Sequence, residues 1–165
     1  MTDPLTLHVI GGRKLGGAER FYVRLANALA ANNLPVMAGV VEGGEIDAAL
    51  SATIPRIYVP QIGVWDLWSR WLLGRAIRQH RPAVVLTYMG RATRLVHLSI
   101  GGPTVHIARL GGFYNLKGYR HAHAWVGNTL GVCNYLIAGG LPADRVFHIG
   151  NFVDTPLTWS AEALA

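Results

Sequence analysis

Cysteine is almost absent from this sequence, which holds only Cys133 among its 165 residues. A single cysteine excludes an internal disulfide and any zinc site built from several cysteines, and it suits a reducing compartment. The sequence also lacks a run of about 18 apolar residues, the length that a membrane-spanning helix needs, and a basic stretch followed by an apolar one at its start. We therefore expect a cytoplasmic protein.

Acidic residues are scarce as well. The chain has 9 aspartates and glutamates against 15 lysines and arginines, which gives a net charge of +6 and a pI near 10.0. This balance favours an anionic partner, such as a sugar nucleotide or a phospholipid surface. The basic residues are scattered and form no long run, so we expect no nucleic-acid partner.

Several motifs that would supply a metal or a nucleophile are missing. There is no Asp-x-Asp pair of a metal-dependent transferase and no G-x-S-x-G nucleophile elbow of a hydrolase. His121 and His123 are two residues apart, with no third ligand at metal spacing. We expect no metal and no resident cofactor. His8, His106 and His148 fall in predicted strands, where we expect hydrogen-bonded core residues.

What the sequence does contain begins with a strand, a glycine-rich turn and a helix. Leu7 to Ile10 is a short apolar run, four glycines follow between positions 11 and 17, and apolar residues at helical spacing continue to about Ala31. This is the entry unit of a parallel α/β sheet, and its helix N-terminus suits an anion. The glycine spacing matches neither G-x-G-x-x-G nor the P-loop, so Gly16 and Gly17 predict a phosphate or ligand contact without naming a nucleotide.

The rest of the chain alternates strands with helices. Apolar runs closed by glycine, proline or polar residues predict seven strands, at 7–10, 35–41, 56–59, 83–88, 104–110, 124–127 and 145–149. Helical spacing predicts helices at 17–31, 45–52, 64–80, 92–100 and 129–138. The alternation predicts an α/β fold with a Rossmann-like, doubly wound parallel sheet of about seven strands and flanking helices. We expect this domain to occupy residues 1–154 and residues 155–165 to begin an interdomain linker or form a tail.

The C-terminal third carries the most specific segments. They are Gly127-Asn128-Thr129, residues 135–146 (YLIAGGLPADRV) and residues 149–154 (IGNFVD). In this order and spacing they resemble the end of the N-terminal domain of family 4 glycosyltransferases. The opening GGAER at 16–20 resembles the glycine-rich loop of the same family, and HRPAVVLTY at 80–88 stands where the family has its rPDvVh strand.

The resemblance implies the N-terminal half of a two-domain GT-B fold. Family members move a sugar with retention from a nucleotide-sugar donor to a glycan or lipid-linked acceptor, as in glycan or lipopolysaccharide biosynthesis, and this half mainly shapes the acceptor side. The family's E-x7-E motif belongs to the second domain and is absent here. We therefore expect the chain to be inactive without a C-terminal domain, and we assign no catalytic residue. Arg109 lies near where many members carry a histidine beside the reacting sugar.

Candidate ligand contacts cluster after three predicted strands. The segment from Arg109 to Arg120 is rich in glycine and aromatic residues and follows a strand at the edge where open α/β sheets bind ligands. Tyr88 and Arg91 follow another strand at the same predicted rim. The predicted substrate or phosphate contacts are Gly16, Gly17, Arg109, Lys117, Tyr88 and Arg91.

A tryptophan-rich segment from Val64 to Arg81 admits two interpretations. Trp65, Trp68 and Trp71 stand among four arginines, which is typical of a helix lying in the plane of a membrane surface. This predicts a membrane contact and a peripheral position on the inner face of the membrane. The alternative is an ordinary crossover helix whose apolar face packs on the sheet.

Two other function classes remain open. One is a plain nucleotide-binding Rossmann protein, such as a dehydrogenase or an epimerase. The missing G-x-G-x-x-G counts against a dehydrogenase, for which Glu42 would be the only candidate ribose ligand. The other is a non-catalytic phosphate-binding or membrane-surface module.

Overall fold

The computed structural model describes residues 3–61 and 66–152, and they form one parallel sheet with helices on both faces. The strands are β1 (Thr6–Ile10), β2 (Val36–Val40), β3 (Arg56–Tyr58), β4 (Val84–Tyr88), β5 (Val105–Leu110), β6 (Ala124–Gly127) and β7 (Val146–His148). Their order is β3-β2-β1-β4-β5-β6-β7, and every neighbouring pair is parallel. The predicted Rossmann-like sheet is confirmed.

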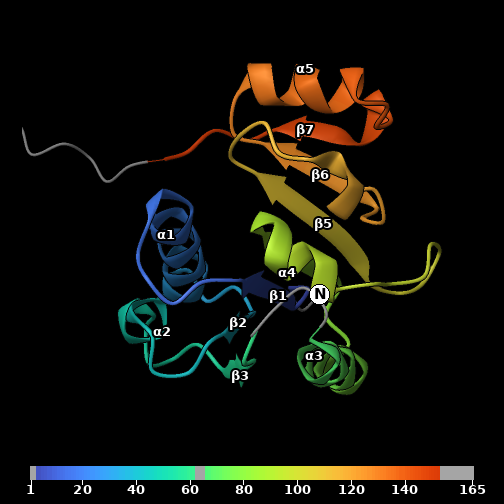
Figure 1. The fold of residues 1–165 in the computed structure, drawn as a ribbon. Coiled ribbons are helices and arrows are strands. Elements are labelled where there is room, and N and C mark those ends of the chain that lie inside the picture. Colours follow the sequence, from blue (N-terminus) through green and yellow to red (C-terminus); the bar gives the residue numbers. More distant parts are fainter. Residues whose placement is uncertain (1–2, 62–65, 153–165) are drawn as a thin grey trace, which may run out of the picture.

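The helices divide between the two faces of this sheet. They are α1 (Gly17–Ala31), α2 (Glu45–Ala49), α3 (Leu67–His80), α4 (Met89–Leu95) and α5 (Leu130–Ala138), with 3-10 turns at Leu116–Gly118 and Ala143–Arg145. Figure 1 shows α1 and α2 on one side of β1 to β3 and α3 on the other. The two-sided cover explains why the strands are apolar runs with little alternation.

Each face of the sheet has its own apolar cluster. Leu7 and Val9 of β1 pack with Leu73 of α3 and with α4, whereas Ile10 packs with Phe21 of α1 on the opposite face. A third cluster joins β5 and β6 to α5. Burial of such side chains is the dominant favourable term in folding, about 25 cal/mol per Å² of apolar surface.

Two helices end differently from the prediction. The helix expected at 92–100 instead begins at Met89 and ends at Leu95, because Val96 takes an extended conformation and is buried against the α3 side of the core. The helix expected at 45–52 ends at Ala49, and the backbone N–H of Ser51 donates to Asn27 Oδ1 of α1 instead of continuing the helix.

The other boundaries agree with the prediction closely. Helix α3 begins after Asp66, whose side chain accepts from the backbone N–H of Ser69 at 2.9 Å, and it ends at Arg81, which is left-handed with φ 46°. The predicted start at Val64, the predicted domain end at Asp154 and the tail 155–165 lie outside the described residues. Within the described ranges, no helix combines the length and apolar character needed to cross a bilayer.

Candidate functional site

The carboxyl ends of β1 and β4 mark the point where the chain changes direction across the sheet. The chain leaves β1 for α1 on one face and leaves β4 for α4 on the other, so the strand order reverses between these two ends, the place where open α/β sheets bind ligands. Gly11 allows the two ends to approach closely, because a Cβ there would lie 2.9 Å from Arg91 Cβ and 3.2 Å from the Ala92 nitrogen. Met89, directly after β4, has a left-handed φ of 65°, which is unusual for a residue with a side chain.

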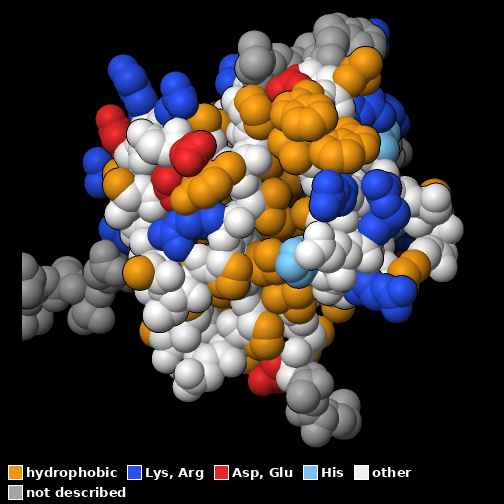
Figure 2. All heavy atoms as spheres, turned by 90° about the horizontal axis from the view of Figure 1, so that it is seen from below, with side chains coloured by type: hydrophobic (Ala, Val, Ile, Leu, Met, Phe, Trp, Pro, Cys, Tyr) orange, Lys and Arg blue, Asp and Glu red, His pale blue; other side chains and the backbone are white. Residues whose placement is uncertain are grey.

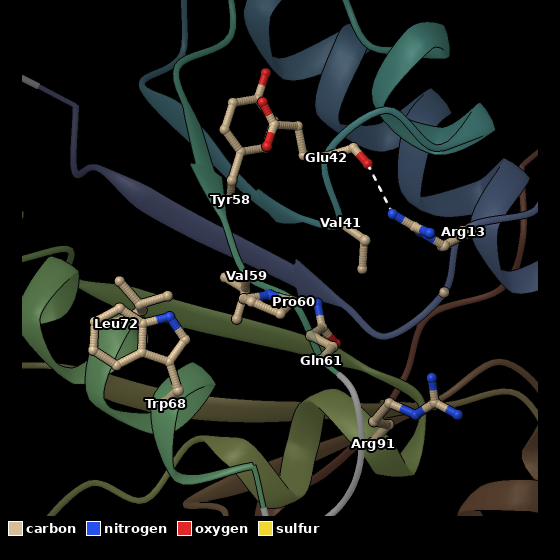
Figure 3. A pocket seen from close by; sticks show the side chains of 11 residues that line it. Arg13, Val41, Glu42, Tyr58, Val59, Pro60, Gln61, Trp68, Leu72 and Arg91 are labelled. Carbon is tan, nitrogen blue, oxygen red and sulfur yellow. Dashed lines mark hydrogen bonds between the residues drawn. The ribbon is translucent and has the colours of Figure 1, made fainter.

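A cavity of about 670 Å³ opens beside this reversal point, at the carboxyl ends of β1, β2 and β3. Figure 3 shows two guanidinium groups at one end of it, with Trp68 and Leu72 at the other. The lining residues are Gly12, Arg13, Val41, Glu42, Tyr58, Val59, Pro60, Gln61, Trp68, Leu72 and Arg91. Five elements or the loops after them therefore contribute to the lining: β1, β2, β3, α3 and α4.

The charged side chains of this cavity are largely unpaired. Arg13 donates to the backbone carbonyl of Glu42 at 3.2 Å, and its own carbonyl accepts from Glu45 N at 2.8 Å, which fixes the turn after β1 against the start of α2. The side chain of Arg91 has no hydrogen bond or ion pair with any other residue that the structure describes. Among the described lining residues Glu42 is the only acid, and it forms no ion pair with either arginine.

Gln61 forms the inner wall of the cavity and was not predicted. Its side chain is buried, Nε2 donates to the carbonyl of Ile10 at 2.6 Å, and its backbone N–H donates to Ser69 Oγ at 2.9 Å. It ties the end of β1 to the start of α3 with a left-handed backbone, φ 52°. No sequence signal marks this role, because it depends on which strands are neighbours.

The glycine-rich turn folds around an acid of its own chain. Glu19 is buried, and a Cβ at Gly16 would lie 2.7 Å from its Oε2, while one at Gly12 would lie 3.1 Å from its Oε1. The space left by these glycines is therefore taken by the Glu19 carboxylate, which disfavours a phosphate beside Gly16. Gly17 has open space around it. The contacts predicted at Gly16 and Gly17 remain predictions.

Arg109 lies in a second, separate environment on the α1 face. Its guanidinium stands 3.7 Å from the ring centre of Phe21 and donates to Asn151 Oδ1 at 2.6 Å. Arg109 is 5 % exposed, and its Nε has no hydrogen-bond partner among the described residues. Burial lowers the pKa of its guanidinium, and the interaction with Tyr88 acts in the opposite direction. A buried cation of this kind has capacity for a further acceptor.

The structure does not gather the six predicted contacts into one site. Arg91 lines the cavity. Tyr88 lies in the core and not on the rim, because its hydroxyl meets His8 Nδ1 at 3.1 Å and its ring packs at 5.1 Å from that of Tyr22. The 3-10 turn that carries the exposed Lys117 packs through Leu116 with α5, on the sheet face opposite Arg109.

Helix α3 exposes two of the three predicted membrane tryptophans. Trp68 and Trp71 are 59 % and 46 % exposed and stack with ring centres 4.9 Å apart, and Arg75 lies 5.6 Å from the Trp71 ring centre. Figure 2 shows hydrophobic side chains gathered on the face seen from below, beside several Lys or Arg side chains. Trp65 lies outside the described residues.

The histidines form no metal site in the described ranges, where no group of three His, Cys, Asp or Glu could hold an ion. His8 and His106 are buried with hydrogen-bond partners, as predicted. His148 is exposed, so its predicted core position is wrong. The reason is that β7 is a three-residue edge strand with its end open to solvent.

Comparisons with known proteins find a curated relative in sequence and several solved structures with a similar fold. Over 115 residues the chain is 30% identical to the lipopolysaccharide core biosynthesis glycosyltransferase LpsD of Rhizobium meliloti (strain 1021), covering 68% of this chain and 33% of LpsD. The Anabaena Alr3699/HepE structure with UDP-glucose superposes with a TM-score of 0.70 at 16% identity, over 91% of this chain and 44% of that one. The UDP-GlcNAc 2-epimerase of Neisseria meningitidis bound to UDP-GlcNAc superposes with a TM-score of 0.58 at 16% identity, over 88% of this chain and 46% of the epimerase.

These likenesses confirm the fold class. No protein-family model matches the chain. The chain spans about a third of the length of the curated relative and less than half of each solved structure. Transferases and epimerases share the fold, so the activity has to be argued from the site and from the relative.

Proposed function

We propose that this chain is the N-terminal, mainly acceptor-side part of a retaining glycosyltransferase of the family 4 type. The observation that carries the proposal is the cavity at the carboxyl ends of β1 to β3, beside the point where the strand order reverses. Open α/β sheets bind ligands at this place. The relationship to LpsD supports sugar transfer over the other activities that this fold hosts.

The lining of the cavity suits a saccharide. Arginine donors serve sugar hydroxyl and acidic groups, while Trp68 and Tyr58 offer aromatic faces for the apolar side of a sugar ring. A nucleotide sugar is the proposed donor, because two of the solved neighbours hold UDP-glucose or UDP-GlcNAc. The proposal includes no metal or other cofactor, in keeping with the absence of an Asp-x-Asp pair.

Residues 1–154 would form the acceptor-side domain, and residues from 155 onward would lead to a donor-side domain. Exposed Phe147, Ile149 and Phe152 stand at the last described strand and just after it, where a second domain would follow. The chain has no E-x7-E pair. Sugar transfer would therefore require the second domain.

The test is a transfer assay with UDP-glucose and a lipopolysaccharide core oligosaccharide. The chain alone is expected to transfer nothing, while a chimera carrying the C-terminal half of LpsD after residue 152 is expected to transfer sugar. In the chimera, Arg91→Ala should raise the KM for the acceptor and leave that for UDP-glucose unchanged. Transfer by the chain alone would contradict the need for a second domain, and 2-epimerisation of UDP-GlcNAc by the chimera would favour an epimerase.

A second candidate role is favoured by α3. Its stacked, exposed Trp68 and Trp71 lie on a helix whose charged residues are all basic, apart from its acidic cap at Asp66. We propose that this surface rests on an anionic membrane at the cytoplasmic side. Since Trp68 also lines the cavity, such a contact would bring a lipid-linked acceptor to the site.

A further inference from the structure

We propose that the acceptor held in this cavity is an acidic saccharide, one that carries a carboxylate or a phosphate group. Arg13 and Arg91 would hold the acidic group at one end, and Trp68 would face the sugar ring at the other. This inference rests on the proposed acceptor role of the cavity and adds the chemical class of the acceptor.

The first argument is the unused hydrogen-bonding capacity of the two arginines. Arg91 has no described partner, and Arg13 uses one donor on a carbonyl. Arg56, which lies outside the cavity, is saturated by comparison: it pairs with the Asp47 carboxylate at 2.9 Å and donates to four backbone carbonyls. A guanidinium presents a planar fork of donors that matches a carboxylate or phosphate, so the free donors in the cavity fit an anion.

The second argument is the charge of the lining. Two arginines face one acid, Glu42, and none of the ion pairs between described residues neutralises them. The Gly16 side of the neighbouring glycine-rich turn is different, because the buried Glu19 carboxylate already occupies it, whereas Gly12 and Arg13 of the same turn reach the cavity. Between these two neighbouring places, the cavity is therefore the one that attracts a negative group.

The third argument is the division of the cavity into a charged end and an aromatic end. Figure 3 places both guanidinium groups away from Trp68 and Leu72. Trp68 and Tyr58 are 59 % and 43 % exposed, so each leaves ring surface open to a ligand, although one face of Trp68 stacks on Trp71. The volume of about 670 Å³ falls within the usual range for small-molecule sites, about 300–1,000 Å³. A sugar acid fills both ends at once, whereas inorganic phosphate would fill only one.

The test measures binding by calorimetry with four probes: digalacturonate, its neutral counterpart galactobiose, galactose 6-phosphate and UDP. Digalacturonate or the sugar phosphate is expected to bind at least about tenfold more tightly than galactobiose, as a charge-assisted bidentate contact would give. Arg91→Ala and Arg13→Ala should each remove that advantage. Arg145→Ala is the matched control, because it removes the same charge from an exposed arginine outside the cavity and should change nothing.

The outcomes separate this inference from the proposed function. Tight binding of only the carboxylated or only the phosphorylated probe supports the inference and identifies the acidic group. Equal affinity for galactobiose and both acidic probes overturns it, while the acceptor role stands. UDP binding that Arg91→Ala abolishes, with no saccharide bound, overturns both, because the cavity would then be a nucleotide site. An equal loss in the Arg145→Ala control would show a net-charge effect and also overturn the inference.

Discussion

Gly11, in the turn after β1, and Gly17, the first residue of α1, differ in the space around their α-carbons. A Cβ at Gly11 would press on Arg91 Cβ and on the Ala92 backbone, whereas one at Gly17 meets nothing within 4 Å. We expect Gly11→Ala to lower the free energy of unfolding by about 1–3 kcal/mol, the usual cost of overpacking. Gly17→Ala should change it by less than about 0.5 kcal/mol. Urea unfolding followed by circular dichroism measures both, and equal effects would contradict the close approach at Gly11.

The sequence predicts only some of the residues of the site. Arg91 was placed at the rim of the sheet and does line the cavity, because a residue just after a strand is bound to lie at its carboxyl end. Tyr58 and Gln61 were missed, since their proximity to Arg13 depends on the order of β1, β2 and β3. The glycine pattern was visible, but the Glu19 side chain that fills it was not, because side-chain direction is set by tertiary packing.

At the scale of elements, α3 carries a testable surface. Trp71 is 46 % exposed and does not line the cavity, so its replacement separates membrane contact from acceptor binding. We expect the chain to sediment with vesicles that contain anionic lipid, and Trp71→Ala to weaken this binding several-fold, because an interfacial tryptophan contributes buried apolar surface.

The matched control is Phe113→Ala, which removes a side chain 69 % exposed in the loop after β5. It should leave vesicle binding unchanged. Equal binding by the Trp71→Ala variant and the original chain would show that the stacked tryptophans do not touch the membrane. High salt should weaken vesicle binding by the original chain and by the Phe113→Ala variant alike, because salt screens the attraction between the basic surface and the anionic lipid.

The strands were predicted more completely than the helix ends, for a physical reason. Strands buried on both faces must be apolar, so β4 stands out as an uninterrupted run. The start of α4 depends on Met89 adopting a left-handed φ of 65°, which its side chain does not favour. Its end depends on Val96 turning extended to fill the core. Both are consequences of packing and leave no local pattern.

For the whole molecule, two buried histidines predict a loss of stability in mild acid. Burial lowers the pKa of His8 to about 4. Burial also lowers the pKa of His106 to about 3, and the nearby His121, His123 and His97 add smaller shifts in the same direction. The unfolded chain, with histidine pKa values near 6.5, binds more protons, so stability is full above about pH 6.5 and falls as the pH drops toward 4.

Each of these histidines adds up to about 1.4 kcal/mol per pH unit to that slope. Urea unfolding between pH 7.5 and 4.5 measures it. His106→Gln should flatten the slope, whereas His148→Gln, at an exposed position, should leave it unchanged. A slope that stays the same in both variants would mean that His106 does not govern the acid response.

The position of β1 inside the sheet, between β2 and β4, also bears on how the chain is made. Thr6 pairs with Val36 on one side and with Val84 on the other. During synthesis, β1 to β3 can assemble early, but the second edge of β1 stays open until residues 84–88 have left the ribosome. Pairs distant in sequence form slowly, and open apolar edges readily pair with other chains. The nascent chain is therefore most vulnerable to misassembly, and most in need of a chaperone, between the third strand and the fourth.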